Sequence, residues 1–178
     1  MNKYKNLAFN TIVFAIGSFG SKILAMFLTR LYTTYMPSDM LGTKELIETM
    51  ANFLIPVFTF SMSESIIRYG LDKDYDNRQV FSTAIMVEVL GLFIMALLSP
   101  FLSFIPFVKG FTPWLVVYVI ISSFRQTCSL FVRSIGYVKL YAFDGILATL
   151  TLFIFNIIFI SGFKMEISGF LLAVIASD

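Results

Sequence analysis

Histidine is missing from the 178-residue sequence, and Cys128 is its only cysteine. Without histidine the chain has no Ser-His-Asp triad, no Cys-His dyad and no His-ligated zinc or haem. A single cysteine excludes both an internal disulfide and a CxxC metal site. We therefore expect no metal centre and no bound cofactor.

Charged residues are also scarce. Asp, Glu, Lys and Arg together make up 13% of the chain, whereas a soluble domain has roughly a quarter. The net charge of +2 and the scattered basic residues give no reason to expect a nucleic-acid partner. In contrast, 58% of the residues are apolar and the mean hydropathy is +0.85. This composition predicts a protein that lies in a lipid bilayer.

The apolar segments are long enough to cross a membrane. A helix needs about 20 apolar residues to span a hydrocarbon core of about 30 Å. This length predicts an all-α polytopic membrane protein, with one transmembrane bundle and five full spans at about 7–31, 42–68, 80–107, 112–135 and 141–163. A sixth apolar segment covers 167–178 and is too short to span, so we expect a fragment truncated within its sixth helix. The alternative is a complete protein with a re-entrant tail.

The distribution of lysine and arginine in the short loops predicts the orientation. With the N-terminus inside, the cytoplasmic flanks carry seven basic residues and the opposite flanks carry four. The seven are Lys3, Lys5, Arg68, Lys73, Arg78, Arg133 and Lys139, and the four are Arg30, Lys44, Lys109 and Lys164. This bias favours a cytoplasmic N-terminus. Because all loops are short, we expect no soluble catalytic domain and no enzyme.

The most informative charged residues inside the predicted spans are Lys22, Glu88 and Arg125. Each costs roughly 2.5–3.5 kcal/mol at a helix centre, so such residues normally face a bundle interior or a wet cavity. At 100° per residue, polar side chains share one face in three of the spans. These faces contain Thr11, Ser18, Lys22, Ala25 and Thr29; Glu45, Glu48, Asn52, Pro56, Thr59 and Ser63; and Tyr118, Ser122, Arg125, Ser129 and Arg133. They predict a shared hydrated cavity, the alternative being hydroxyls that only hold neighbouring helices together.

The depth of these charges suggests how they pair. Counted from the cytoplasmic ends, Glu88 lies about 12 Å deep, Arg125 about 15 Å and Lys22 about 22 Å. Glu88 and Arg125 are therefore predicted partners, while Lys22 has no anion at its level. The surplus positive charge would favour an anionic guest. The alternative is a structural Glu88–Arg125 pair with a Lys22 that extends toward the interface. Pro56 is expected to bend the second helix.

Several short motifs resemble the opening of Wzx-type polysaccharide flippases, whose superfamily includes the multidrug antiporters and the lipid II flippase. The first are Arg30 at the end of the first helix, a Pro-Ser-Asp turn, and Gly42 opening the second helix. The others are "IIRYG" at 66–70, "VFSTA" at the start of the third helix, "RSIGYVKLYA" at 133–142 and "SGFLLAVIASD" at the chain end. The motifs cover nearly the whole chain, but they are loose and do not specify a substrate.

The resemblance implies the N-terminal lobe of a MATE-like two-lobe transporter in the bacterial cytoplasmic membrane. Such proteins alternately open a central cavity to each side and move a polyprenyl-diphosphate-linked oligosaccharide for polysaccharide biosynthesis. A polysaccharide polymerase or glycosyltransferases are the further partners that it implies. The resemblance implies that Arg30 is a cation facing the cavity, and that Lys22 and Arg125 are two more. With Asn52 and Glu88 they complete the expected substrate site.

Two other functions stay open. A multidrug or cation antiporter of the same superfamily needs a membrane-embedded carboxylate, and Glu88 is the only deep candidate; this alternative gains if Glu88 is free of Arg125. A membrane enzyme acting on lipid-linked sugars would need acid and base residues near the interface, usually on sizeable loops. Whether H⁺ or Na⁺ drives transport is not determined by the sequence.

Overall fold

The computed structural model describes residues 22–72 and 74–178, and all its regular elements are helices. A helix over 22–35 is followed by α2 (Ser38–Phe58), α3 (Met62–Gly70), α4 (Asn77–Leu102) and α5 (Thr112–Ser134). The chain continues through α6 (Val138–Asn156), the π-helical turn η1 (Ile157–Gly162) and α7 (Glu166–Ser177). The first predicted span lies mostly outside the described residues.

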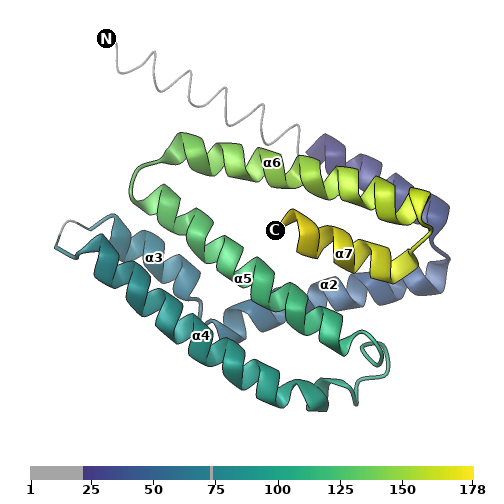
Figure 1. Ribbon diagram of the computed structural model, residues 1–178, viewed down its shortest axis with the longest axis horizontal. Helices are drawn as coiled ribbons and strands as arrows, with labels where there is room; N and C mark the ends of the chain where they lie inside the picture. The colour runs from purple at the N-terminus through teal and green to yellow at the C-terminus, as the bar shows by residue number, and fades with distance from the viewer. Residues whose placement is uncertain (1–21, 73) are drawn as a thin grey trace, which may run out of the picture.

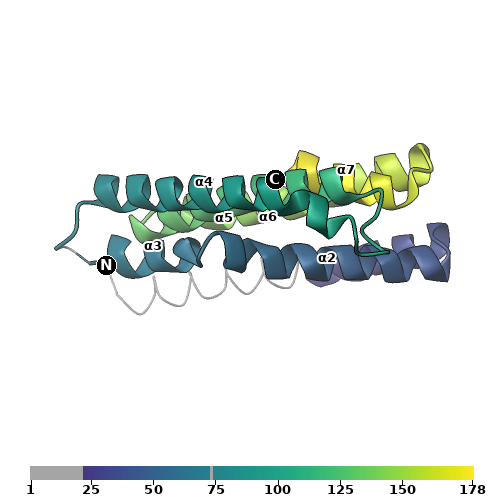
Figure 2. The same ribbon diagram turned by 90° about the horizontal axis from the view of Figure 1, so that it is seen from below.

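The helices form two layers whose long axes run roughly along the length of the molecule (Figure 1). The helix over 22–35, α2 and α3 make one layer, and α4, α5, α6 and α7 make the other (Figure 2). Buried apolar side chains from both layers meet between them, among them Tyr32, Ile47, Leu115 and Leu171. The core is therefore a thin sheet of side chains between two layers of helices.

Three helical stretches are long and apolar enough to cross a membrane: Asn77–Leu102, Thr112–Ser134 and Val138–Gly162. The pair α2 and α3 makes a fourth candidate if the two are one span, although they meet at an angle of 55°. The predicted single span at 42–68 is thus divided into two helices. The predicted span at 80–107 begins earlier and ends earlier, because residues 103–111 form turns after Pro100.

The break between α2 and α3 has a local cause. Pro56 has no N–H to continue the α2 ladder, and Phe60 and Ser61 both adopt left-handed backbone conformations with φ of 51°. Thr59 donates its hydroxyl to the Ile55 carbonyl at 2.8 Å, so one acceptor of the last turn of α2 is satisfied. The expected bend at Pro56 is therefore confirmed, and it is completed by the two left-handed residues.

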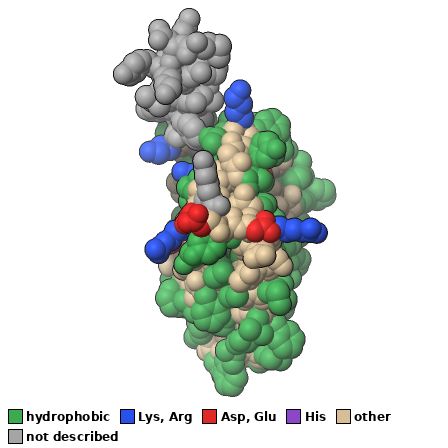
Figure 3. All heavy atoms as spheres, turned by 90° about the vertical axis from the view of Figure 1, so that its left-hand side faces the viewer, with side chains coloured by type: hydrophobic (Ala, Val, Ile, Leu, Met, Phe, Trp, Pro, Cys, Tyr) green, Lys and Arg blue, Asp and Glu red, His purple; other side chains and the backbone are tan. Residues whose placement is uncertain are grey.

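The surface of the bundle is strongly apolar, as expected for helices that face lipid. On α4, the side chains of Met86, Phe93, Leu97 and Phe101 are each 60% or more exposed. In the end-on view of Figure 3, hydrophobic side chains cover most of the visible described surface, and the charged side chains are few. Large apolar side chains exposed in this number along one helix are typical of a surface that contacts lipid or a partner, which supports a membrane location.

Candidate functional site

An ion-pair network joins three helices around Arg125, which lies in the middle of α5. Its Nη2 is 3.1 Å from Oδ2 of Asp144 on α6, and its Nη1 is 3.3 Å from Oδ1 of Asp178. Ser129 donates a hydrogen bond to the same Asp144 oxygen at 2.9 Å, and Ser122 donates one to Asp178. The guanidinium is therefore held between two carboxylates from two other parts of the chain.

This network borders an open pocket of about 590 Å³. Its polar lining comes from Arg125, Asp144, Asp178, Ser129 and the phenol of Tyr141, and its apolar lining from Ile121, Phe124, Cys128, Val132 and Leu140. The Arg125 side chain is 28% exposed, so it is partly accessible from this pocket. Such a mixture of ionic, hydroxyl and apolar groups suits an amphipathic guest.

The predicted pairing of Arg125 with Glu88 is wrong. Ser123 and Thr127, four residues apart on α5, lie beside Glu88 of α4. Arg125 lies midway between them in sequence, so its side chain leaves the opposite side of the helix. The prediction compared only the depths of the two residues in the membrane. The direction in which each side chain leaves its helix gives them different neighbours.

The predicted surplus of positive charge is also wrong at this position. Arg125 has two carboxylates within 3.3 Å, so the cluster is not cationic. Sequence reasoning overlooked both aspartates, although Asp144 lies inside a predicted span and was open to the same reading as Glu88. Asp178 gave no such signal, because its position opposite α5 depends on how α7 packs.

Glu88 is fully buried on α4. Within the described residues neither of its carboxylate oxygens has a hydrogen-bond partner, and the nearby Thr127 hydroxyl has none either. Ser123 donates its own hydroxyl to the Ile120 carbonyl at 3.0 Å. A buried carboxylate without a partner is costly in its charged form, so Glu88 is the candidate site for taking up a proton or a small cation.

The structure reveals a buried cation that the sequence reading placed in a flank outside the membrane. Lys44 of α2 is only 5% exposed, and its Nζ lies 2.6 Å from Glu48 and 3.0 Å from Glu45. The ammonium also lies 4.7 Å from the ring centres of both Tyr32 and Phe170. The sequence counted Lys44 only as a flanking charge, whereas the structure also encloses it within the bundle, near the start of α2.

Tyr32 extends this closed cluster to α6. Its hydroxyl donates to Oδ1 of Asn156 at 3.0 Å, and the Asn156 amide donates to the Leu152 carbonyl at 2.7 Å. Asn156 is fully buried and the Tyr32 ring meets the Phe170 ring edge-on at 5.8 Å. The cluster links the helix over 22–35 with α2, α6 and α7.

The remaining predicted site residues lie away from the Arg125 pocket. Lys22 and Arg30 are exposed on the helix over 22–35, and neither lines that pocket. Asn52 is exposed on α2 and lines a smaller pocket with Gln126 of α5. Of the first predicted polar face, Thr11 and Ser18 lie outside the described residues. The structure thus brings none of the five predicted residues together into one site.

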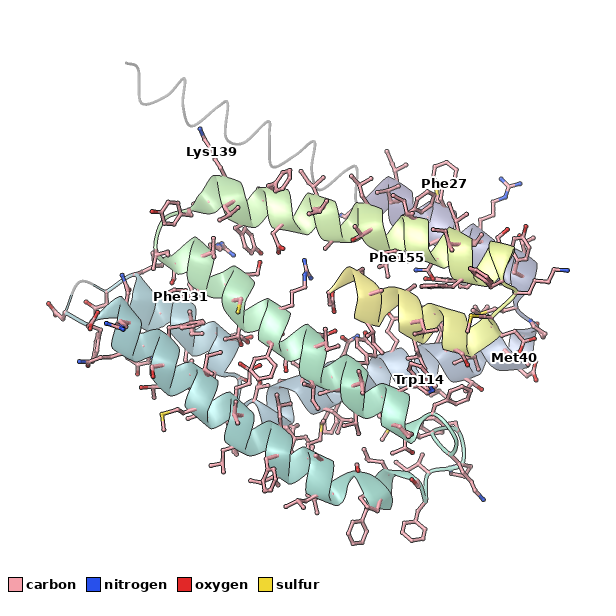
Figure 4. The ribbon with its side chains drawn as sticks, in the orientation of Figure 1. Phe27, Met40, Trp114, Phe131, Lys139 and Phe155 are labelled. Carbon is pink, nitrogen blue, oxygen red and sulfur yellow. The ribbon has the colours of Figure 1, made fainter. Side chains whose placement is uncertain are left out.

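Other charged and aromatic side chains, among them Lys139 and Phe131, do not line the Arg125 pocket. Lys139, at the start of α6, projects away from the helices (Figure 4). Phe131 of α5 packs its ring against Phe81 of α4, with ring centres 4.4 Å apart.

Comparison of the chain with protein-family models, with curated proteins and with solved structures gives no match. The functional inferences below therefore rest on the geometry of these sites and on the motifs of the sequence.

Proposed function

We propose that the chain is one lobe of a membrane transporter that moves a lipid-linked oligosaccharide across the cytoplasmic membrane for polysaccharide biosynthesis. The observation that carries the proposal is Arg125, a guanidinium in the middle of a candidate span that borders an open amphipathic pocket. The motif resemblance adds the two-lobe architecture and a polymerase or glycosyltransferases as neighbours in the membrane. The bias of lysine and arginine among the loops adds the cytoplasmic N-terminus.

The chemistry of the head group explains why such a pocket is needed. A pyrophosphate and its sugars cannot enter hydrocarbon, because their charges and hydroxyls would lose all hydrogen bonds. Arginine binds phosphate oxygens through two parallel N–H donors, the same geometry with which it binds a carboxylate. Ser129 and Tyr141 also line this pocket, and each carries a hydroxyl with which a sugar can form hydrogen bonds.

Because two aspartates already bind Arg125, the binding of an anionic substrate there is an exchange of one anion for another. At rest Asp144 and Asp178 occupy the guanidinium, so a pyrophosphate must displace at least one of them. That displacement would loosen the contact of α5 with α6 or α7. Substrate binding and a rearrangement of the lobe are then one event, as alternating access requires.

The experiment is a substitution at Arg125 in the full-length protein, in cells whose surface glycan depends on it. We expect Arg125→Gln to lower surface polysaccharide by at least about tenfold, the effect of losing about 1.4 kcal/mol of binding. Undelivered lipid-linked precursor should accumulate in the membrane.

Arg78→Gln is the matched control, because Arg78 is an exposed arginine at the start of α4. It should leave surface polysaccharide unchanged. Normal surface glycan in Arg125→Gln, with normal amounts of protein in the membrane, would refute the proposal.

A second candidate function is a cation-coupled antiporter, and the isolation of Glu88 from Arg125 favours it. A buried carboxylate with two unpartnered oxygens can carry a proton or a dehydrated cation through a conformational change. In a coupled antiporter Glu88→Gln should abolish transport driven by an ion gradient while the protein still folds, because the amide has nearly the same shape. In an uncoupled flippase the same variant should transport normally, so this substitution separates the two candidates.

A further inference from the structure

The break between α2 and α3 borders a second pocket, of about 200 Å³, whose lining is unusually polar for a membrane bundle. Asn52 and Pro56 come from α2, Ser61 from the turn, and Ser63 and Glu64 from α3; Ile55 and Gln126 complete the wall. Its lining therefore offers carboxylate, carboxamide and hydroxyl oxygens, and it contains neither an aromatic ring nor a lysine or arginine.

Pro56 supplies a further acceptor beside this pocket. In an unbroken helix the N–H of residue 56 would donate to the carbonyl of Asn52, four residues earlier, but proline has no N–H. The backbone carbonyl of Asn52 thus loses its helical donor at the residue whose side chain also lines the pocket.

Ser63 is the clearest sign that the pocket takes a ligand. It is 6% exposed and lines the pocket. Among the described residues, its side chain has no hydrogen-bond partner, unlike those of Ser122, Ser123, Ser129 and Ser134. Because Ser63 lines the pocket and its hydroxyl bonds to no other described residue, the hydroxyl is available to a water, an ion or a polar ligand there.

We propose that this pocket binds a sodium ion. Oxygen atoms are the ligands of hard cations, and Glu64 provides one negative charge, which matches a monovalent ion. The last carbonyls of α2 add a partial negative charge, while the first turn of α3 stabilises the Glu64 carboxylate. Broken membrane helices commonly hold ions in this way. A sugar ring is disfavoured because no aromatic side chain is present for it to stack on.

The site has a structural consequence for the lobe. Its ligands come from both sides of the break and from α5, so a bound ion would hold α2 and α3 at their mutual angle of 55°. This inference goes beyond the proposed transport function, because it does not depend on which molecule the lobes carry.

The test is sodium binding by the purified full-length protein. At constant ionic strength, NaCl replacing choline chloride should raise the melting temperature along a saturable curve, and KCl should need at least about tenfold higher concentration. Glu64→Gln should abolish the saturable response. Ser63→Ala should raise the apparent sodium dissociation constant about three- to tenfold.

Glu166→Gln is the matched control, since Glu166 is likewise an exposed glutamate in the first turn of a helix; it should respond as the wild type does. Equal melting curves in NaCl and choline chloride would overturn the proposal, as would a full sodium response in Glu64→Gln. If that variant does not fold, Glu64→Ala takes its place, and a sodium affinity within about twofold of the wild type then overturns it. Radiolabelled sodium binding gives the same comparison without relying on thermal stability.

Discussion

Arg125 and Lys44 are both cations inside the bundle, and each has two carboxylates within reach. The partners of Lys44, Glu45 and Glu48, lie on its own helix, and two aromatic rings cover its ammonium. The partners of Arg125 lie on other elements, and its guanidinium borders an open pocket. The first arrangement is closed and local, whereas the second is open and tertiary.

The difference indicates which cation can act and which one holds the fold. The Lys44 side chain is 6% exposed and its ammonium contacts two rings, so it is much less accessible than Arg125. Arg125 borders an open pocket, so the proposed function requires only that an anionic head group replace one of its carboxylates. We therefore assign stability to the Lys44 cluster and ligand exchange to the Arg125 network.

The strongest test of this contrast is Lys44→Met. Removing the ammonium leaves Glu48 without its 2.6 Å partner and removes two cation–π contacts. We expect the free energy of unfolding to fall by about 2.5 kcal/mol, mostly through the two buried cation–π contacts, because Glu48 is 37% exposed and stays partly hydrated. The measurement is reversible unfolding in mixed detergent micelles. Lys109→Met, at an exposed lysine, should have little effect. Equal stabilities of the two variants would show that the cluster does not hold the lobe together.

Tyr32→Phe is expected to have the next largest effect. The ring stays between its neighbours, but the fully buried Asn156 loses the hydroxyl that donates to its Oδ1. An unsatisfied buried acceptor costs about 2 kcal/mol. Tyr137→Phe, at an exposed tyrosine, is the control. A loss below about 0.5 kcal/mol would mean that the link from the helix over 22–35 to α6 is replaceable.

Arg125→Gln should affect stability less than either of these variants, although it should affect transport most. Its side chain is 28% exposed and Asp144 is 41% exposed, so solvent screens the pair. We expect a loss of about 1 kcal/mol in the same unfolding measurement. A loss as large as that of Lys44→Met would erase the distinction between an exchangeable and a structural cation.

The smallest expected effect is the dependence of these stability differences on salt concentration. Raising the salt concentration from about 0.1 M to about 1 M shortens the screening length from about 10 Å to about 3 Å. The stability difference between wild type and Arg125→Gln should shrink by about 0.3 kcal/mol. That for Lys44→Met should shrink by less, because its ammonium and its two cation–π contacts are buried. Parallel salt responses would contradict the assignment of one open and one closed site.

Much of the helical layout could be predicted, because it depends on properties that the chain carries locally. Long apolar runs predicted the helices that became α4, α5 and α6, and Pro56 predicted the bend. Their ends were less predictable, since a helix ends where turns and packing compete, as after Pro100. The division of the second span also required left-handed conformations at Phe60 and Ser61. Neither phenylalanine nor serine commonly adopts this conformation, so the sequence did not predict it.

The sequence predicted that charged residues within the spans form a site, but it did not predict which residues contact one another there. Glu88 and Arg125 stood out because charge inside an apolar run is costly wherever the helix packs. Their partners did not, because ion pairing falls off within a few ångströms and a helix turns 100° per residue. An estimate of depth that ignored the direction of each side chain around its helix therefore predicted the wrong pair, Glu88 and Arg125.

The sequence by itself determined that this chain is helical, that it belongs in a bilayer and that charged groups lie within its spans, because composition and hydrophobic run length fix these properties. Only the tertiary structure decided that Lys44 is enclosed by Tyr32 and Phe170, that Arg125 meets Asp144 and Asp178, and that Glu88 meets no partner among the described residues. The physical reason is that those contacts join residues far apart in the chain, and their distances are set by how the helices rotate and pack against one another.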